Sequence, residues 1–147
     1  MESYLTRRLL DEQTDPNLHP FLIKTLCALA GDADTERITD FLCAQPESNL
    51  AIDVLLRHGC QEQAKRLWKV WQRSGVPEGG FSLLGRFAVQ EAASAAWEAV
   101  RSGDWFVARD GVMGLLGLDL SELRREIIAR LDLEEGRSLF TEMLPAL

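Results

Sequence analysis

The sequence lacks any apolar run that approaches the ~20 residues a membrane-spanning helix requires. Its first residues, MESYLTRRLLDEQ, carry charges where a secretory signal peptide needs an apolar centre. Its 16 basic residues form no concentrated basic face and are outnumbered by 23 acidic ones, which gives a net charge of −7. Because nucleic-acid phosphates are bound by clustered positive charge, these absences predict a cytoplasmic protein that binds neither membrane nor nucleic acid.

Histidine and cysteine are also scarce, with two and three residues, and no C-x-x-C motif occurs. The spacing of Cys27, Cys43 and Cys60 fits no common zinc site, so we expect three free thiols that fill the core. His58 and Cys60 flank a turn glycine, where a histidine is more often a helix C-terminal cap than a base. The sequence therefore predicts no catalytic residue, no metal site and no cofactor.

Helical periodicity is what the sequence does contain: apolar residues recur at helical spacing in almost every segment, and none alternates as a strand does. Residues 34–44, 61–73 and 86–102 are among the predicted helices, and acidic capping boxes at 119–122 and 132–135 precede two more. The pattern predicts one all-α domain over residues 1–147, an array of about seven helices stacked as antiparallel hairpins.

The clearest break in this pattern is SGVPEGGFSLLG, residues 74–85, where one proline and four glycines argue against a regular helix. The apolar Phe81, Leu83 and Leu84 favour a loop that docks onto the core, and a hinge between two sub-bundles is the alternative. Later glycines, Gly111, Gly114 and Gly117, precede no Lys-Ser or Lys-Thr, so they are no phosphate loop. Their spacing predicts close packing against another helix.

Two stretches, 48–74 and 92–116, repeat a helix–glycine–helix plan in which an alanine follows the turn glycine after five residues. In the second stretch the turn is Gly103, followed by Trp105 and Ala108. Small residues line its first helix at Ala92, Ala95, Ala96 and Ala99. This stretch resembles a tetratricopeptide repeat.

The first stretch matches that family weakly, because Ile52 and Trp71 stand where small residues are preferred. Its turn glycine, Gly59, lies 44 residues before Gly103, whereas the family repeats every 34 or so. The resemblance implies stacked antiparallel helix pairs and a concave face that accepts a helix or an extended peptide. Small bacterial secretion chaperones with such hairpins are similar to this chain in size and composition.

The predicted helix 86–102 has a second apolar stripe, which contains Val89, Trp97 and Val100. The alanines are expected to seal the hairpin, so this stripe faces either a neighbouring hairpin or a partner, and base rates favour the neighbour. With Trp105, these three residues are the candidate partner-binding residues.

We expect a non-enzymatic protein-binding module, an adaptor or chaperone that holds a helical or extended segment of another protein. The alternative is a small acidic inhibitor or immunity-type protein that blocks a basic site on its target, for which the net charge is the main support. Self-association as a homodimer is a separate hypothesis, based on the apolar final helix that contains Leu139, Phe140 and Met143.

Overall fold

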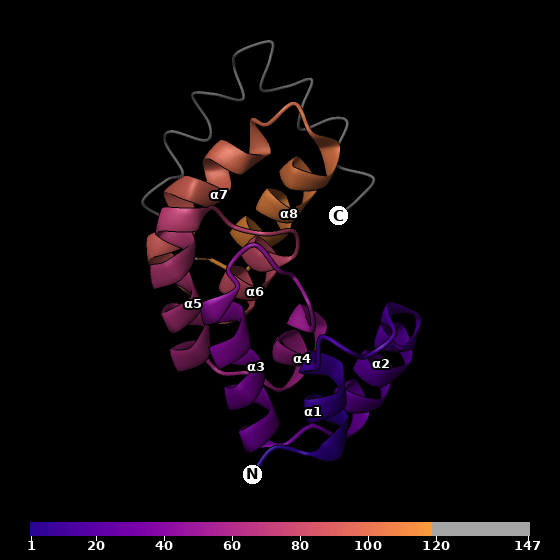
Figure 1. The fold of residues 1–147 in the computed structure, drawn as a ribbon. Coiled ribbons are helices and arrows are strands. Elements are labelled where there is room, and N and C mark those ends of the chain that lie inside the picture. The colour runs from indigo at the N-terminus through magenta and orange to yellow at the C-terminus, as the bar shows by residue number, and fades with distance from the viewer. Residues whose placement is uncertain (119–147) are drawn as a thin grey trace.

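The computed structural model describes residues 1–118, which contain helices and no β-strand (Figure 1). The helices are α1 (Tyr4–Leu10), α2 (His19–Leu29), α3 (Asp32–Ala44), α4 (Ile52–His58), α5 (Gln61–Ser74), α6 (Gly80–Arg86), α7 (Ala93–Val100) and α8 (Trp105–Leu116). Two 3₁₀ turns, η1 (Pro16–Leu18) and η2 (Gln90–Ala92), precede α2 and α7. The all-α prediction is confirmed. The helices predicted after residue 118, including the proposed dimer helix, lie outside the described residues.

The helices form an array in which each packs on close neighbours along the chain. Four neighbouring pairs pack together: α1 with α2, α3 with α4, α5 with α6, and α7 with α8. Further contacts join helices two places apart: α1 with α3, α2 with α4, α3 with α5, α4 with α6, and α6 with α8. Figure 1 shows the result, with α1 and α2 at one end of the described chain and α7 and α8 at the other.

The predicted pairing of helices is correct for 92–116, where α7 and α8 pack together, and wrong for 48–74. That stretch contains α4 and α5, but the extensive contacts of α4 are with α2, α3 and α6, and those of α5 are with α3 and α6. The difference arises because α6 is an additional helix, and it packs on both of them.

The prediction that residues 74–85 hold no regular helix is wrong, because α6 begins at Gly80. Its first turn has no local side-chain cap, and the carboxylate of Asp110 on α8 takes that role. It accepts the backbone N–H groups of Phe81 and Ser82 at 3.0 Å each, and the Ser82 hydroxyl at 2.6 Å. Orphan N–H groups of a first turn need such an acceptor. The expected docking onto the core is confirmed, because Phe81, Leu83 and Leu84 are buried.

The predicted helix 86–102 is divided in the structure. The chain leaves α6 after Arg86, passes through a left-handed residue, Ala88 (φ 53°), and resumes the helix only at Ala93. The Val89 N–H donates to the Leu84 carbonyl at 2.9 Å, and Val89 is fully buried. Burial of Val89 beneath the end of α6 accounts for this turn, and helical periodicity alone does not reveal it.

The predicted close packing is confirmed at Gly111 and Gly114 of α8 and at Gly117, the residue that follows the helix. Gly114 and Gly117 lie against α6 at Gly85, where a Cβ added to Gly85 or to Gly117 would overlap the backbone of the facing helix. Gly111 faces α7, where its added Cβ would lie 2.7 Å from the Ala96 carbonyl oxygen. The absence of side chains therefore lets α8 touch both neighbouring helices with its backbone.

The core runs through the whole array and includes Trp68 and Trp71 of α5. Cys27 and Cys43 are half-buried and pack against this core, as expected. The same expectation is wrong for Cys60, which is exposed because it precedes the first turn of α5 as its N-cap residue. All three cysteines are free of disulfide bonds.

Candidate functional site

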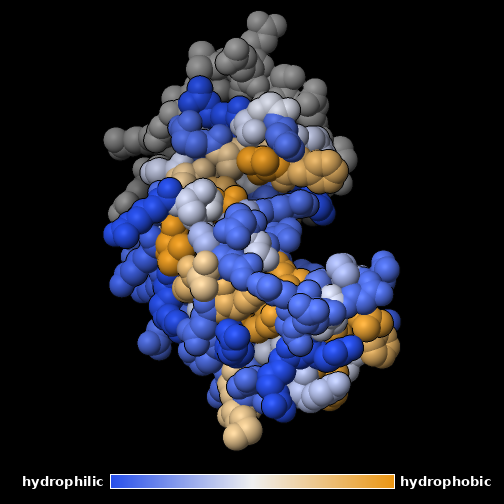
Figure 2. Space-filling view, in the orientation of Figure 1, coloured by the Kyte–Doolittle hydropathy of each residue, from blue (hydrophilic) through white to orange (hydrophobic). Residues whose placement is uncertain are grey.

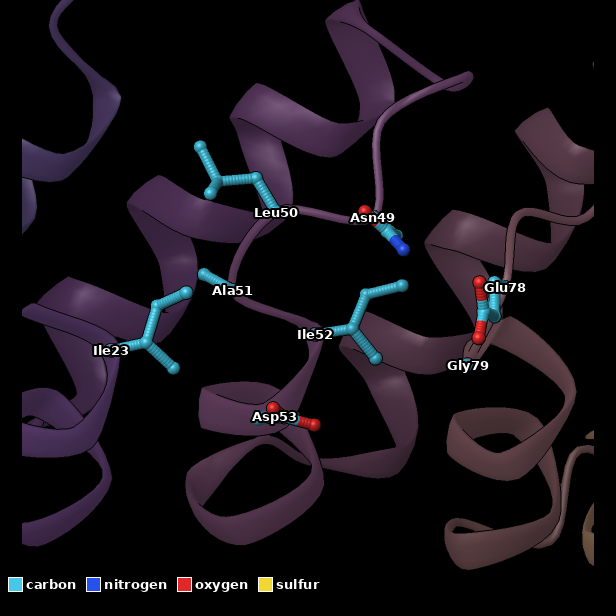
Figure 3. Close-up of a pocket in the computed structure, with 8 residues that line it drawn as sticks. All are labelled: Ile23, Asn49, Leu50, Ala51, Ile52, Asp53, Glu78 and Gly79. Atoms are coloured by element: carbon cyan, nitrogen blue, oxygen red, sulfur yellow. The ribbon is translucent and has the colours of Figure 1, made fainter. Parts of the chain in front are cut away.

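A hollow of about 380 Å³ opens between α2, the start of α4 and the segment that leads into α6 (Figure 3). Its lining residues are Ile23, Asn49, Leu50, Ala51, Ile52, Asp53, Glu78 and Gly79. Figure 3 places Ile52 between Ile23 on one side and Glu78 on the other. The space-filling view shows the surface hollowed on one side, between the end that carries α8 and the end that carries α2 (Figure 2).

The wall formed by α4 is set by an unusual backbone conformation. Ser48 does not cap the helix of this wall, which begins at Ile52 and has Ala51 as its N-cap residue. Ala51 has φ 66°, a left-handed conformation that costs an alanine about 1–2 kcal/mol. The Ser48 hydroxyl instead accepts the Leu50 N–H at 3.1 Å and fixes the turn before it. The hollow is therefore lined by a constrained segment.

On the opposite wall, Gly79 has φ 86°, a conformation that favours glycine. A Cβ added there would lie 3.5 Å from Ile52 Cγ2, so Gly79 faces Ile52 across the space of a small side chain. The two walls are held together by the packing of α6 on α4.

The charged residues that line the hollow are both acidic. Asp53 lies in the first turn of α4 and Glu78 lies two residues before α6, and both are exposed. Burial, and then the Asp53 carboxylate, raise the pKa of the Cys27 thiol, and Arg57 lowers it by a smaller effect. Because a thiolate is the nucleophilic form of cysteine, the raised pKa disfavours the reactive form of Cys27.

His58 makes a hydrogen bond that links two helices. Its Nε2 donates to the Cys27 carbonyl oxygen at 2.6 Å and joins α4 to α2. This geometry agrees with the interpretation of His58 as a residue that stabilises a helix end. Within residues 1–118, no group of three or more His, Cys, Asp or Glu side chains is placed to hold a metal ion.

Of the four candidate partner-binding residues, the structure brings three into the interior. Val89, Trp97 and Val100 are buried, and Trp97 is 8% exposed. This placement agrees with the packing alternative for their stripe. Trp105 is separate from them and 47% exposed, at the first position of α8.

A second apolar surface, not predicted from the sequence, lies on the outward face of α8. Four large side chains are exposed on it, namely Trp105, Phe106, Met113 and Leu116, and we call them the α8 stripe. The Trp105 and Phe106 rings meet edge to face at 5.3 Å, and the Arg109 guanidinium lies 5.7 Å from the Trp105 ring centroid. Positions 105, 109, 113 and 116 are spaced as one face of a helix, so this surface could have been predicted from the sequence.

Exposed apolar residues also occur at the other end of the array. Leu18, Phe21 and Leu29 are exposed on η1 and α2. In Figure 2, apolar residues are visible at the end that carries α8 and at the end that carries α2, with the hollowed side between them.

No protein-family model, curated protein or solved structure matches the chain. The resemblance to tetratricopeptide repeats therefore stays a prediction from the residues. Among the helices of residues 1–118, none combines the length and the apolar character that crossing a bilayer requires.

Proposed function

We propose that this chain is a non-enzymatic protein-binding module, an adaptor or chaperone that holds an amphipathic helix of a partner protein. The observation that carries the proposal is the α8 stripe, because a soluble chain rarely leaves several large apolar side chains together on one exposed face. Residues at helical spacing form a ridge that fits the apolar face of another helix. The three free cysteines support the reducing cytoplasm as its compartment.

Arg109 indicates the chemistry of that helix. Its guanidinium lies over Trp105 within the stripe and its side chain is exposed, so a carboxylate beside the apolar face of the partner helix would find a cation there. The expected partner segment is therefore apolar on one face, with an acidic residue at the edge of that face.

The second candidate function is an acidic inhibitor that blocks a basic site on its target. It is favoured by the net charge of −7. The two functions differ in their response to salt, because charge-driven binding weakens as the Debye length falls to about 3 Å near 1 M salt, and apolar binding does not.

A pull-down at low and high salt tests the proposal with three proteins: the unchanged chain, a Phe106→Ser/Leu116→Ser double variant, and a Leu18→Ser/Phe21→Ser control. The control removes the same two residue types from exposed positions on η1 and α2. The proposal predicts a protein that the unchanged chain and the control retain at high salt and that the α8 variant loses.

Binding that high salt abolishes would favour the inhibitor, and binding that the α8 variant keeps would exclude the stripe. Light scattering adds a further check. If the α8 variant changes a dimer into a monomer, the stripe binds a second copy of this chain and the proposed partner is wrong.

A further inference from the structure

The hollow carries two exposed carboxylates on two of its walls, Asp53 and Glu78. In residues 1–118, Asp53 and Glu78 make no ion pair and accept no side-chain hydrogen bond. Elsewhere, Arg66 binds Glu36 at 2.9 Å and Asp40 at 2.5 Å, so those two exposed carboxylates share one cation of the fold. The hollow thus presents two negative charges, from two separate walls, that no ion pair of the described residues holds.

The other side chains that line the hollow are mainly aliphatic, with Asn49 as a polar exception. Ile52 and Ala51 are buried at its base, and the half-buried Ile23 and Leu50 complete it. A hollow that is aliphatic inside and anionic at its sides matches a side chain with an aliphatic stem and a cationic head. Lysine and arginine have this form.

The size of the hollow limits what it can admit. Its volume of about 380 Å³ lies at the low end of the ≈ 300–1,000 Å³ found for ligand sites, which suits a side chain and excludes a folded element. Its walls are already constrained by Ala51 and Gly79, so little conformational entropy is lost on binding.

We infer that the hollow between Asp53 and Glu78 receives one lysine or arginine side chain of the bound protein segment. This inference rests on the proposed function and adds a second contact to it. The α8 stripe holds the apolar face of the partner, and the hollow selects for a cation elsewhere on the same partner. Electrostatic contacts of this kind contribute specificity more than affinity.

The test uses small probes on the full chain. N-acetyl-arginine amide and N-acetyl-lysine amide are titrated while the methyl NMR signals of Ile23 and Ile52 are followed, with N-acetyl-citrulline amide and N-acetyl-norleucine amide as uncharged counterparts. We expect saturable shifts of both methyl signals with the cationic probes and none with the uncharged ones. The affinity should fall about five- to tenfold in the Asp53→Asn/Glu78→Gln double variant, as the loss of two exposed ion pairs implies.

A Glu62→Gln/Glu91→Gln double variant is the matched control, because it removes the same charge from exposed positions outside the hollow. An equal loss of affinity in this control would overturn the inference, and so would equal binding of the uncharged probes or unchanged Ile methyl signals. The pull-down separates this failure from that of the proposed function, because the α8 variant tests the stripe and leaves the hollow unchanged.

Discussion

Asp110 and Phe81 lie 29 residues apart in the sequence, and the Asp110 carboxylate accepts the Phe81 backbone N–H at 3.0 Å. The bond couples the middle of α8 to the first turn of α6. The carboxylate is buried and also accepts the N–H and hydroxyl of Ser82. A helix whose own sequence supplies no cap is thereby stabilised by a helix that follows it in the chain.

Replacing Asp110 with alanine should therefore destabilise the fold by about 1–3 kcal/mol, the cost of leaving buried backbone donors without an acceptor. Urea unfolding of the variant measures this loss. Ser82→Ala is the matched control: it removes only the hydroxyl bond and keeps both backbone bonds, so its effect should be smaller. Equal effects of the two variants would contradict the capping role of Asp110.

The contact between α6 and α8 gives a second prediction. Gly114→Ala would place a Cβ 2.7 Å from the Phe81 carbonyl oxygen, which is a backbone atom that cannot rotate away. We expect a loss of about 1–3 kcal/mol, as for other overpacked interiors. Gly103→Ala is the control, because nothing lies within 4 Å of its added Cβ. Thermal unfolding should show a lower Tm for Gly114→Ala only. An unchanged Tm for Gly114→Ala would rule out the close approach of α6 and α8.

The third prediction concerns Asp34, which is buried beside the N-terminal helix. Burial by itself raises the pKa of this carboxyl, but hydrogen bonds from the backbone of Ser3 and Gly31 and from the Thr6 hydroxyl outweigh it, so the pKa is lowered from 3.8. A carboxyl with a lowered folded-state pKa contributes stability that is complete above its unfolded pKa. This contribution is lost as the pH falls through the folded pKa.

Asp34→Asn should consequently be less stable than the unchanged chain at pH 7, and the difference should shrink progressively as the pH falls below about 4. Urea unfolding at pH 7, 5 and 3 checks this trend. Glu2→Gln, a change near the same end of the chain at a carboxyl for which the structure shows no hydrogen bond, is the control for the loss of one negative charge. A constant difference for Asp34→Asn would mean that the hydrogen bonds do not depend on its charge.

Local sequence signals were sufficient for α3 and α5. The predicted helices 34–44 and 61–73 correspond to Asp32–Ala44 and Gln61–Ser74, since both have a sustained apolar period and clear breaks beside them. Local sequence signals were insufficient for α6, because its glycines and the proline that precedes it disfavour a helix. Its stability comes from Asp110 and from the backbone contact with Gly114, which no nearby residue reveals.

The candidate site was beyond local reasoning for a similar reason. Ile23, Ile52 and Glu78 belong to three separate elements, and only the packing of α4 on α2 and α6 brings them around one hollow. The α8 stripe is a different case, because its helical spacing is visible in the sequence. The sequence did not reveal that the glycine-bearing face of α8 packs against α6 and α7 and leaves the opposite face exposed.

The last prediction compares two tryptophans of the same hairpin. Trp97 is 8% exposed in α7, so Trp97→Ala should cost about 3–5 kcal/mol, as other large-to-small changes in a core do. Trp105 is 47% exposed, so Trp105→Ala should leave the Tm nearly unchanged while weakening partner binding through the α8 stripe. Thermal unfolding of both variants, with the pull-down for Trp105→Ala, measures both effects. A stable Trp97→Ala protein would mean that Trp97 is not needed for packing and would restore it as a candidate contact. A Trp105→Ala protein that binds normally would remove Trp105 from the partner surface.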